Sequence, residues 1–87
     1  MNIKKELIKR EIAGDTVLVP VGHTVYEANG LFILNEAGAF LWDILPNAQD
    51  EAALVAQLLE EYDVDPQTAA TDVAAFLQKL QTMGIID

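Results

Sequence analysis

The side chains that could do chemistry in this sequence are one histidine and a group of carboxylates. His23 has no second histidine and no cysteine to complete a metal site or to form a nucleophile pair, so we interpret it as a loop residue. Carboxylates gather at Glu60, Glu61, Asp63 and Asp65. They fall at an expected helix end and loop, where no apolar pocket would raise a carboxyl pKa for acid catalysis. We therefore predict no catalytic residue and no metal ligand.

Motifs for phosphates and cofactors are also missing from the sequence. Its five glycines are isolated, so no glycine-rich loop could hold a phosphate group. The absence of cysteine excludes disulfides and thiolate chemistry. With 87 residues there is room for one core but little for a substrate cleft beside it. The composition therefore predicts a binding module without a cofactor, not an enzyme.

Charge is distributed unevenly along the chain. Four of the five basic residues are Lys4, Lys5, Lys9 and Arg10. From Glu11 onward the net charge is −12, and Lys79 is the one remaining base. Because nucleic-acid binding relies on neutralising phosphates, we predict no nucleic-acid partner. An acidic surface of this kind favours a cationic protein or peptide segment, although solubility alone also explains it.

Neither a membrane span nor a signal peptide is predicted. No apolar run approaches the roughly 20 residues that cross a bilayer, and the lysines near the start precede no apolar core. We expect one soluble cytoplasmic domain over residues 1–87, with residues 1–7 flexible.

Short β-rich runs occupy the first part of the sequence. We predict strands over 8–13, 16–21 and 31–34, with a turn at Gly14 and Asp15. Pro20 cannot donate a ladder hydrogen bond and so belongs at an edge, a bulge or a strand end. Residues 22–24 read as a loop, 25–27 as a short extended piece, and Asn29-Gly30 as a turn. In the third strand Phe32 and Leu34 share one face, so one alternating pair should serve the core.

Helical spacing begins at Asn35, directly after the third strand. Asn35, Asp50 and Asp65 are predicted to cap three successive helices, and Pro66 suits the first turn of the last one. Gly84 is predicted to end that helix in a left-handed conformation, with Ile85 folding back on Leu80. The residues expected to face inward are Phe40, Leu41, Ile44 and Leu45; Leu54, Val55, Leu58, Leu59 and Tyr62; and Ala69, Val73, Phe76, Leu77, Leu80 and Met83.

The element order is therefore β-β-β-α-α-α. Strands that precede helices predict an α+β domain in which the helices cover one face of a three-stranded antiparallel sheet. The same description fits a winged helix-turn-helix-like architecture.

Several segments together resemble the PqqD family. They are Leu34-Asn35-Glu36-Ala37 with Leu41-Trp42, the helix segment 58–62, Asp72-Val73 with Phe76-Leu77 and Leu80, and Gly84-Ile85-Ile86. Each is a packing motif, but their order and spacing are specific, and the resemblance covers residues 10–87. It implies a winged-helix-like peptide chaperone that captures the leader region of a ribosomally made precursor peptide. It also implies a modifying enzyme as partner, often a radical-SAM protein, in pyrroloquinoline quinone or related peptide biosynthesis.

Physical reasoning places the peptide at the third strand. An extended peptide can add to a free sheet edge, and residues 31–34 have no lysine or proline to block pairing. A flank of small residues on the last helix would let the peptide lie between helix and sheet, unless that flank packs on the second helix. The predicted peptide-binding residues are Leu31, Phe32, Ile33, Leu34, Ala70, Ala74, Leu77 and Gln81.

Two other classes of function fit the same elements. A winged-helix DNA-binding regulator has this architecture, but the acidic last helix counts against it. An acidic docking subunit of a larger enzyme is the other alternative.

Overall fold

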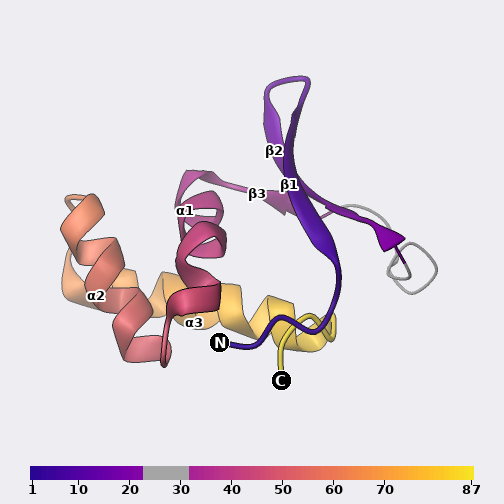
Figure 1. Ribbon diagram of the computed structural model, residues 1–87. Coiled ribbons are helices and arrows are strands. Elements are labelled where there is room, and N and C mark those ends of the chain that lie inside the picture. Colours follow the sequence, from indigo (N-terminus) through magenta and orange to yellow (C-terminus); the bar gives the residue numbers. More distant parts are fainter. Residues whose placement is uncertain (23–31) are drawn as a thin grey trace.

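The computed structural model describes residues 1–22 and 32–87, in which strands precede helices (Figure 1). The strands are β1 (Leu7–Ile12), β2 (Asp15–Pro20) and β3 (Phe32–Leu34), joined antiparallel in the order β1-β2-β3. The helices are α1 (Glu36–Ile44), the 3-10 helix η2 (Leu45–Asn47), α2 (Glu51–Glu61) and α3 (Pro66–Thr82). The predicted α+β fold, with a three-stranded antiparallel sheet followed by three α-helices, is confirmed.

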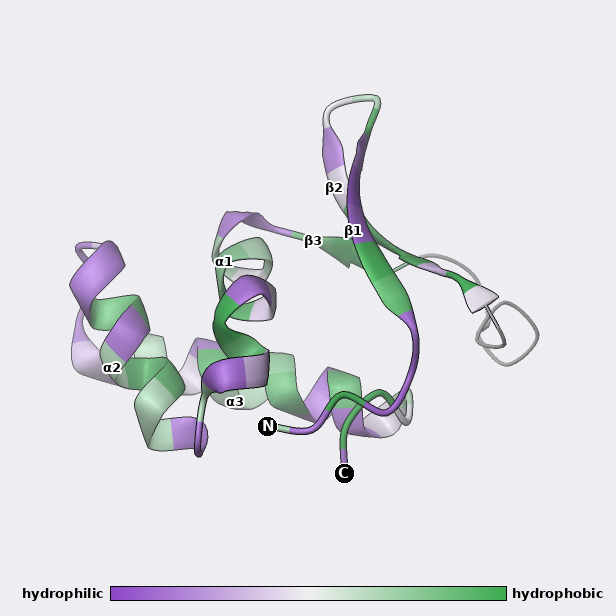
Figure 2. Cartoon of the chain, in the orientation of Figure 1, coloured by the Kyte–Doolittle hydropathy of each residue, from purple (hydrophilic) through white to green (hydrophobic). Residues whose placement is uncertain are grey.

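Strands β1 and β2 form a hairpin that projects from the helices (Figure 1). Its two loop residues are Ala13 and Gly14, with φ of 52° and 86°, and Ile12 pairs with Asp15 across the loop. Positive φ at both loop residues is what the tight hairpin turn of type I′ requires. The turn therefore lies one residue earlier than the sequence predicts. Hydrophobic residues begin β1, three charged residues follow, and Ile12 ends the strand near the tip (Figure 2).

The sheet turns one face toward the helices. Leu18 pairs with Phe32 and Thr16 pairs with Leu34, so these four side chains share that face. Leu34 is buried, whereas Ile33 points the other way and is 64% exposed. The predicted alternation in this strand is confirmed, with Phe32 and Leu34 as the inward pair. Pro20 is the last residue of β2, at a strand end as predicted.

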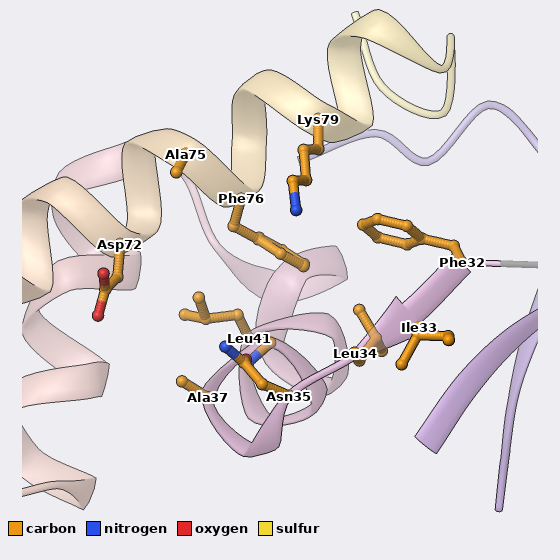
Figure 3. A pocket seen from close by; sticks show the side chains of 11 residues that line it. Phe32, Ile33, Leu34, Asn35, Ala37, Leu41, Asp72, Ala75, Phe76 and Lys79 are labelled. Carbon is orange, nitrogen blue, oxygen red and sulfur yellow. The ribbon is translucent and has the colours of Figure 1, made fainter. Parts of the chain in front are cut away.

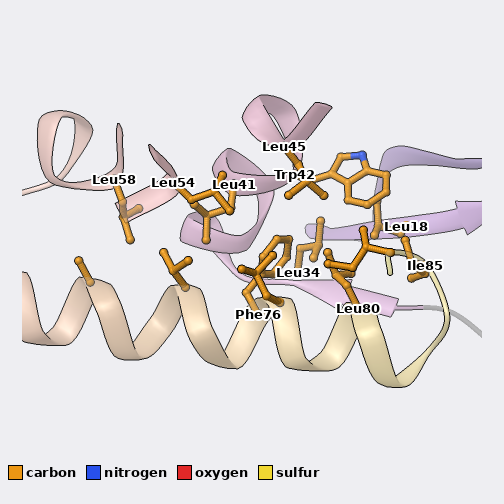
Figure 4. Close-up of a cluster of buried hydrophobic side chains, with 14 residues drawn as sticks. Leu18, Leu34, Leu41, Trp42, Leu45, Leu54, Leu58, Phe76, Leu80 and Ile85 are labelled. Carbon is orange, nitrogen blue, oxygen red and sulfur yellow. The ribbon is translucent and has the colours of Figure 1, made fainter. Parts of the chain in front are cut away.

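A single hydrophobic core lies between the sheet, α1, α2 and α3 (Figure 4). Five α3 residues predicted to face inward are buried, and Met83 packs at the margin. In α1 the buried side chains are Leu41 and Trp42, while Phe40 and Ile44 are only partly buried. Phe40 instead meets Tyr62 edge-to-face, with ring centroids 5.7 Å apart. The core cluster comprises Leu18, Leu34, Leu41, Trp42, Leu45, Leu54, Leu58, Ala69, Val73, Phe76, Leu77, Leu80, Ile85 and Ile86.

The predicted helix caps are confirmed. The Oδ1 atoms of Asn35, Asp50 and Asp65 accept backbone N–H groups at 2.7, 2.9 and 3.0 Å, each three residues further on. These bonds satisfy donors that the first helical turn leaves free.

The predicted end of α3 is also confirmed. Gly84 has a φ of 72°. The Ile85 N–H donates to the Leu80 carbonyl at 2.8 Å, and the Gly84 N–H donates to the Gln81 carbonyl at 3.0 Å. This pair of bonds is the Schellman motif, which satisfies the last carbonyls of the helix.

The start of the chain is held against its end. Ile3 forms a β-bridge with Ile86, and the Lys4 N–H donates to the Ile85 carbonyl at 2.7 Å. The Lys5 ammonium donates to the Met83 carbonyl at 3.0 Å. These contacts involve the segment 1–7, for which the sequence predicts flexibility. The predicted elements between 23 and 31, with His23 and Leu31, lie outside the described residues.

Candidate functional site

The hairpin determines which peptide groups of β2 point toward β3. Residues that flank a two-residue loop, here Ile12 and Asp15, form a hydrogen-bonded pair. In an antiparallel ladder, hydrogen-bonded pairs alternate with non-bonded ones along each strand. Counted from Asp15, the peptide groups of Thr16 and Leu18 therefore point away from β1 and toward β3.

This alternation leaves Ile33 with its backbone directed outward. Phe32 and Leu34 are the partners of Leu18 and Thr16, so their peptide groups are used within the sheet. The N–H and C=O of Ile33 then point to the outer side of β3, which no other strand of the described residues 1–22 and 32–87 covers. The edge thus offers one donor and one acceptor from the same residue, the arrangement that an added antiparallel strand needs.

A groove of about 170 Å³ lies beside this free edge, between β3, the start of α1 and one side of α3 (Figure 3). Figure 3 shows Phe32, Leu41 and Phe76 directed into it, and Ile33 is among the residues that line it. Its lining residues are Phe32, Ile33, Leu34, Asn35, Ala37, Gly38, Leu41, Asp72, Ala75, Phe76 and Lys79.

Close packing at the strand–helix corner shapes one wall of the groove. Asn35 caps α1 on the N–H of Gly38. A Cβ added at Gly38 would lie 3.1 Å from Asn35 Oδ1 and 3.5 Å from Leu34 Cδ2. Glycine therefore lets the first turn of α1 sit close against β3, and the cap holds the angle between strand and helix.

One stripe of α3, which we call the groove flank, faces β3. Its members Asp72, Ala75, Phe76 and Lys79 follow helical spacing, so they share one side of the helix. Asp72 and Lys79 stand at the two ends, with the small and aromatic side chains between them (Figure 3). The groove is thus apolar in the middle and oppositely charged at its ends.

The two charges on the groove flank have no partner among residues 1–22 and 32–87. Neither forms an ion pair there, whereas Lys4 pairs with Asp87 at 3.2 Å and Lys9 pairs with Asp43. The side chains of Asp72 and Lys79 are both exposed. They are available to a bound molecule.

The predicted site residues divide into two groups. Phe32, Ile33 and Leu34 line the groove, and Leu31 lies outside the described residues. The four predicted α3 residues form a different stripe, which we call the far flank, and none of them lines the groove. The far flank comprises Ala70, Ala74, Leu77 and Gln81.

The far flank lies across the buried stripe of α3 from the groove. Leu77 is only 5% exposed and belongs to the core cluster. Leu77 and Gln81 line a separate hollow together with Met1, Glu51 and Ile86. Ala70 and Ala74 are exposed. The chain termini and the start of α2, not β3, are the neighbours of this side of the helix.

The sequence predicts peptide contacts on the far flank and none on the groove flank. The only available signal was its spacing, because residues 72, 75, 76 and 79 recur at intervals of three and four. The far flank also follows helical spacing and has more small residues. Nothing in the local pattern told the two sides apart.

The groove contains no arrangement for proton transfer or metal binding. The hydroxyl and N–H of Thr68 lower the pKa of the Asp65 carboxyl, and burial, Glu36 and Glu61 raise that of the Tyr62 phenol. Neither group lines the groove.

Within the described ranges, no three His, Cys, Asp or Glu side chains come together to hold a metal ion. No helix of the described chain is long and apolar enough to cross a membrane.

Comparisons with known proteins agree with this fold. The chain shares its fold with a solved structure titled "TbiB1 in Complex with the TbiA(beta) Leader Peptide", with a TM-score of 0.73 and 24% sequence identity. The similarity covers 100% of this chain and 95% of the other. A search of curated proteins finds no significant match. The sequence profile of the family described as "Coenzyme PQQ synthesis protein D (PqqD)" matches residues 15–86, and the chain therefore belongs to the PqqD family.

Proposed function

We propose that this protein is a non-catalytic module that captures the leader region of a ribosomally made precursor peptide and presents it to a modifying enzyme. The observation that carries the proposal is the free edge of β3 beside an apolar groove on α3. Membership of the PqqD family and the fold shared with TbiB1, whose structure contains a leader peptide, support it.

The leader would form a fourth strand beside β3. Backbone hydrogen bonds to Ile33 would supply affinity that depends little on sequence, and the groove would select side chains at alternate positions. Phe32, Leu41 and Phe76 present apolar surface to those side chains. Burial of one leucine-sized side chain there contributes about 2 kcal/mol.

A binding role without catalysis agrees with the chemistry of the groove. Asp72 and Lys79 stand at opposite ends, with apolar side chains between them (Figure 3). They cannot act together on one bond, and no nucleophile lies between them in the set of lining residues. The modifying enzyme, which we propose to be a radical-SAM protein, would therefore supply the reaction.

An NMR titration tests the proposal. Isotope-labelled protein is titrated with synthetic peptides that cover the short open reading frames beside its gene. We expect amide shifts to concentrate at residues 32–38 and 72–79, which border the groove. Shifts confined to α2, or no shift with any of these peptides, would contradict leader capture at this site. A radical-SAM gene in the same neighbourhood would identify the partner class.

A further inference from the structure

We propose that the groove reads the direction and charge order of the captured strand. The preferred segment has a cationic residue first, an apolar residue two positions later and an acidic residue four positions later. This inference rests on the proposed function and adds the class of peptide to it.

The direction follows from how β3 and α3 lie relative to each other. Lys79 lies beside Phe32, at the beginning of β3, and Asp72 lies at the other end near Ala37 (Figure 3). β3 runs from Phe32 to Leu34, so an antiparallel neighbour runs the opposite way. Its earlier residues would pass Asp72 and its later residues would pass Lys79.

The charges at the two ends favour opposite partners. Asp72 has no ion pair in the described part of the chain, and Asp65 lines a shallow hollow that adjoins it. The Asp65 carboxylate near the Asp72 end of the groove increases the preference of that end for a cation. Lys79 is the one base on α3 and the one base after Arg10 in the sequence. In a chain with a net charge of −9, it is the favourable position for an acidic side chain.

Spacing sets the intervals in the peptide. Lys79 comes seven positions after Asp72 on α3, which is a rise of about 10 Å along the helix axis. A strand advances about 3.4 Å per residue, and its alternate side chains point the same way. The first and fifth residues of a strand are therefore about 14 Å apart, and two long charged side chains can reach the helix charges by leaning inward.

The middle of the groove flank takes the apolar residue. Ala75 is small and leaves space, and Phe76, which is 8% exposed, presents its ring to the groove. Phe32 is partly buried on the opposite side. A leucine or phenylalanine in the third position of the segment would lie between these two rings.

Two synthetic peptides of the same composition test the inference. The forward peptide carries lysine, leucine and glutamate in that order, separated by single threonines and flanked by threonines with blocked ends. The reversed peptide exchanges the lysine and the glutamate. We expect the forward peptide to bind about fivefold more tightly at low salt, because exposed ion pairs each contribute little. The preference should shrink as salt screens the charges. Affinity is measured from amide shifts of Ile33 and Lys79.

A charge exchange in the protein provides the matched control. The double variant Asp72→Lys with Lys79→Asp keeps the net charge and exchanges the two ends of the groove. We expect it to prefer the reversed peptide by a similar factor. If the two residues had only a structural role, the double variant would lose affinity for both peptides equally.

The possible outcomes separate the two proposals. Equal affinity of the two peptides, or a preference that the double variant retains, overturns the charge order while peptide capture stands. Tighter binding of the reversed peptide to the unmodified protein overturns the antiparallel direction. No shift at residues 32–38 or 72–79 with either peptide contradicts the binding site itself.

Discussion

The two flanks of α3 have similar sequences and different surroundings. Each contains alanine and a large apolar residue at helical spacing, but the groove flank has a charged residue at both ends and the far flank has one polar end. The groove flank faces β3, whose outer backbone groups are free, whereas the far flank faces the chain termini and the start of α2. The two flanks therefore differ in their neighbours, not in their content of small residues. The proposed peptide site is on the groove flank because that flank lies beside the outer edge of β3.

The largest effect expected on the far flank is on stability. Leu77→Ala removes a buried side chain that packs in the core and should lower the free energy of unfolding by about 3 kcal/mol. Under conditions in which the variant is folded, its affinity for the forward peptide should stay within about twofold of that of the unmodified protein. Denaturant unfolding and peptide titration measure the two quantities. A large loss of affinity in the folded variant would place the far flank in the binding site.

Ile33→Pro tests the free edge against which the groove flank lies. Proline removes the N–H that the added strand would use, which should cost about 2 kcal/mol of binding free energy. Ile33→Thr keeps the N–H and is the control, since the side chain is largely exposed. Calorimetric titration with the forward peptide compares the two. Similar losses in both variants would argue against backbone pairing at Ile33.

Neighbouring alanines compare the flanks directly. Ala75→Trp fills the groove and should weaken binding of the forward peptide by about tenfold. Ala74→Trp places the same side chain on the far flank and should leave affinity nearly unchanged. Both positions are exposed, so stability should change by less than about 0.5 kcal/mol. The reverse order of effects would show that the peptide lies on the far flank.

The smallest effect concerns the cap that positions one wall of the groove. Asn35→Ala loses the bond to the Gly38 N–H and should lower stability by about 1 kcal/mol, and affinity should fall with it. Asp50→Ala removes the equivalent cap of α2, away from the groove, with a similar loss of stability. Its peptide affinity should not change. Thermal unfolding and peptide titration of both variants measure these effects. Equal peptide affinities of the two variants would show that the angle between β3 and α1 does not affect binding.

Much of the fold could be predicted because its signals are local. A cap needs one side chain and an N–H three residues later, so Asn35, Asp50 and Asp65 were identifiable from sequence. The end of α3 at Gly84 was equally local. The sequence predicts the hairpin turn one residue too late, because Ala13 takes a positive φ that its residue type does not favour.

The docking of the N-terminal segment could not be predicted. Its partners Ile85 and Ile86 lie at the other end of the chain, and bridging them depends on where α3 ends in space. Residues 1–6 have no periodicity that indicates such contacts. Only the folded chain brings the two segments together.

The sequence by itself determined the elements, their caps, the buried stripe of α3 and the alternation of side chains in β3. Each of these depends on residues that are close along the chain. The structure showed that Phe32 and Leu34 are the inward pair. The tertiary structure alone decided which side of α3 faces the free strand. A helix presents two equivalent flanks beside its buried stripe, and the local pattern is symmetric about that stripe. The packing of β3 and α1 against one side breaks this symmetry and places Asp72, Ala75, Phe76 and Lys79 in the groove.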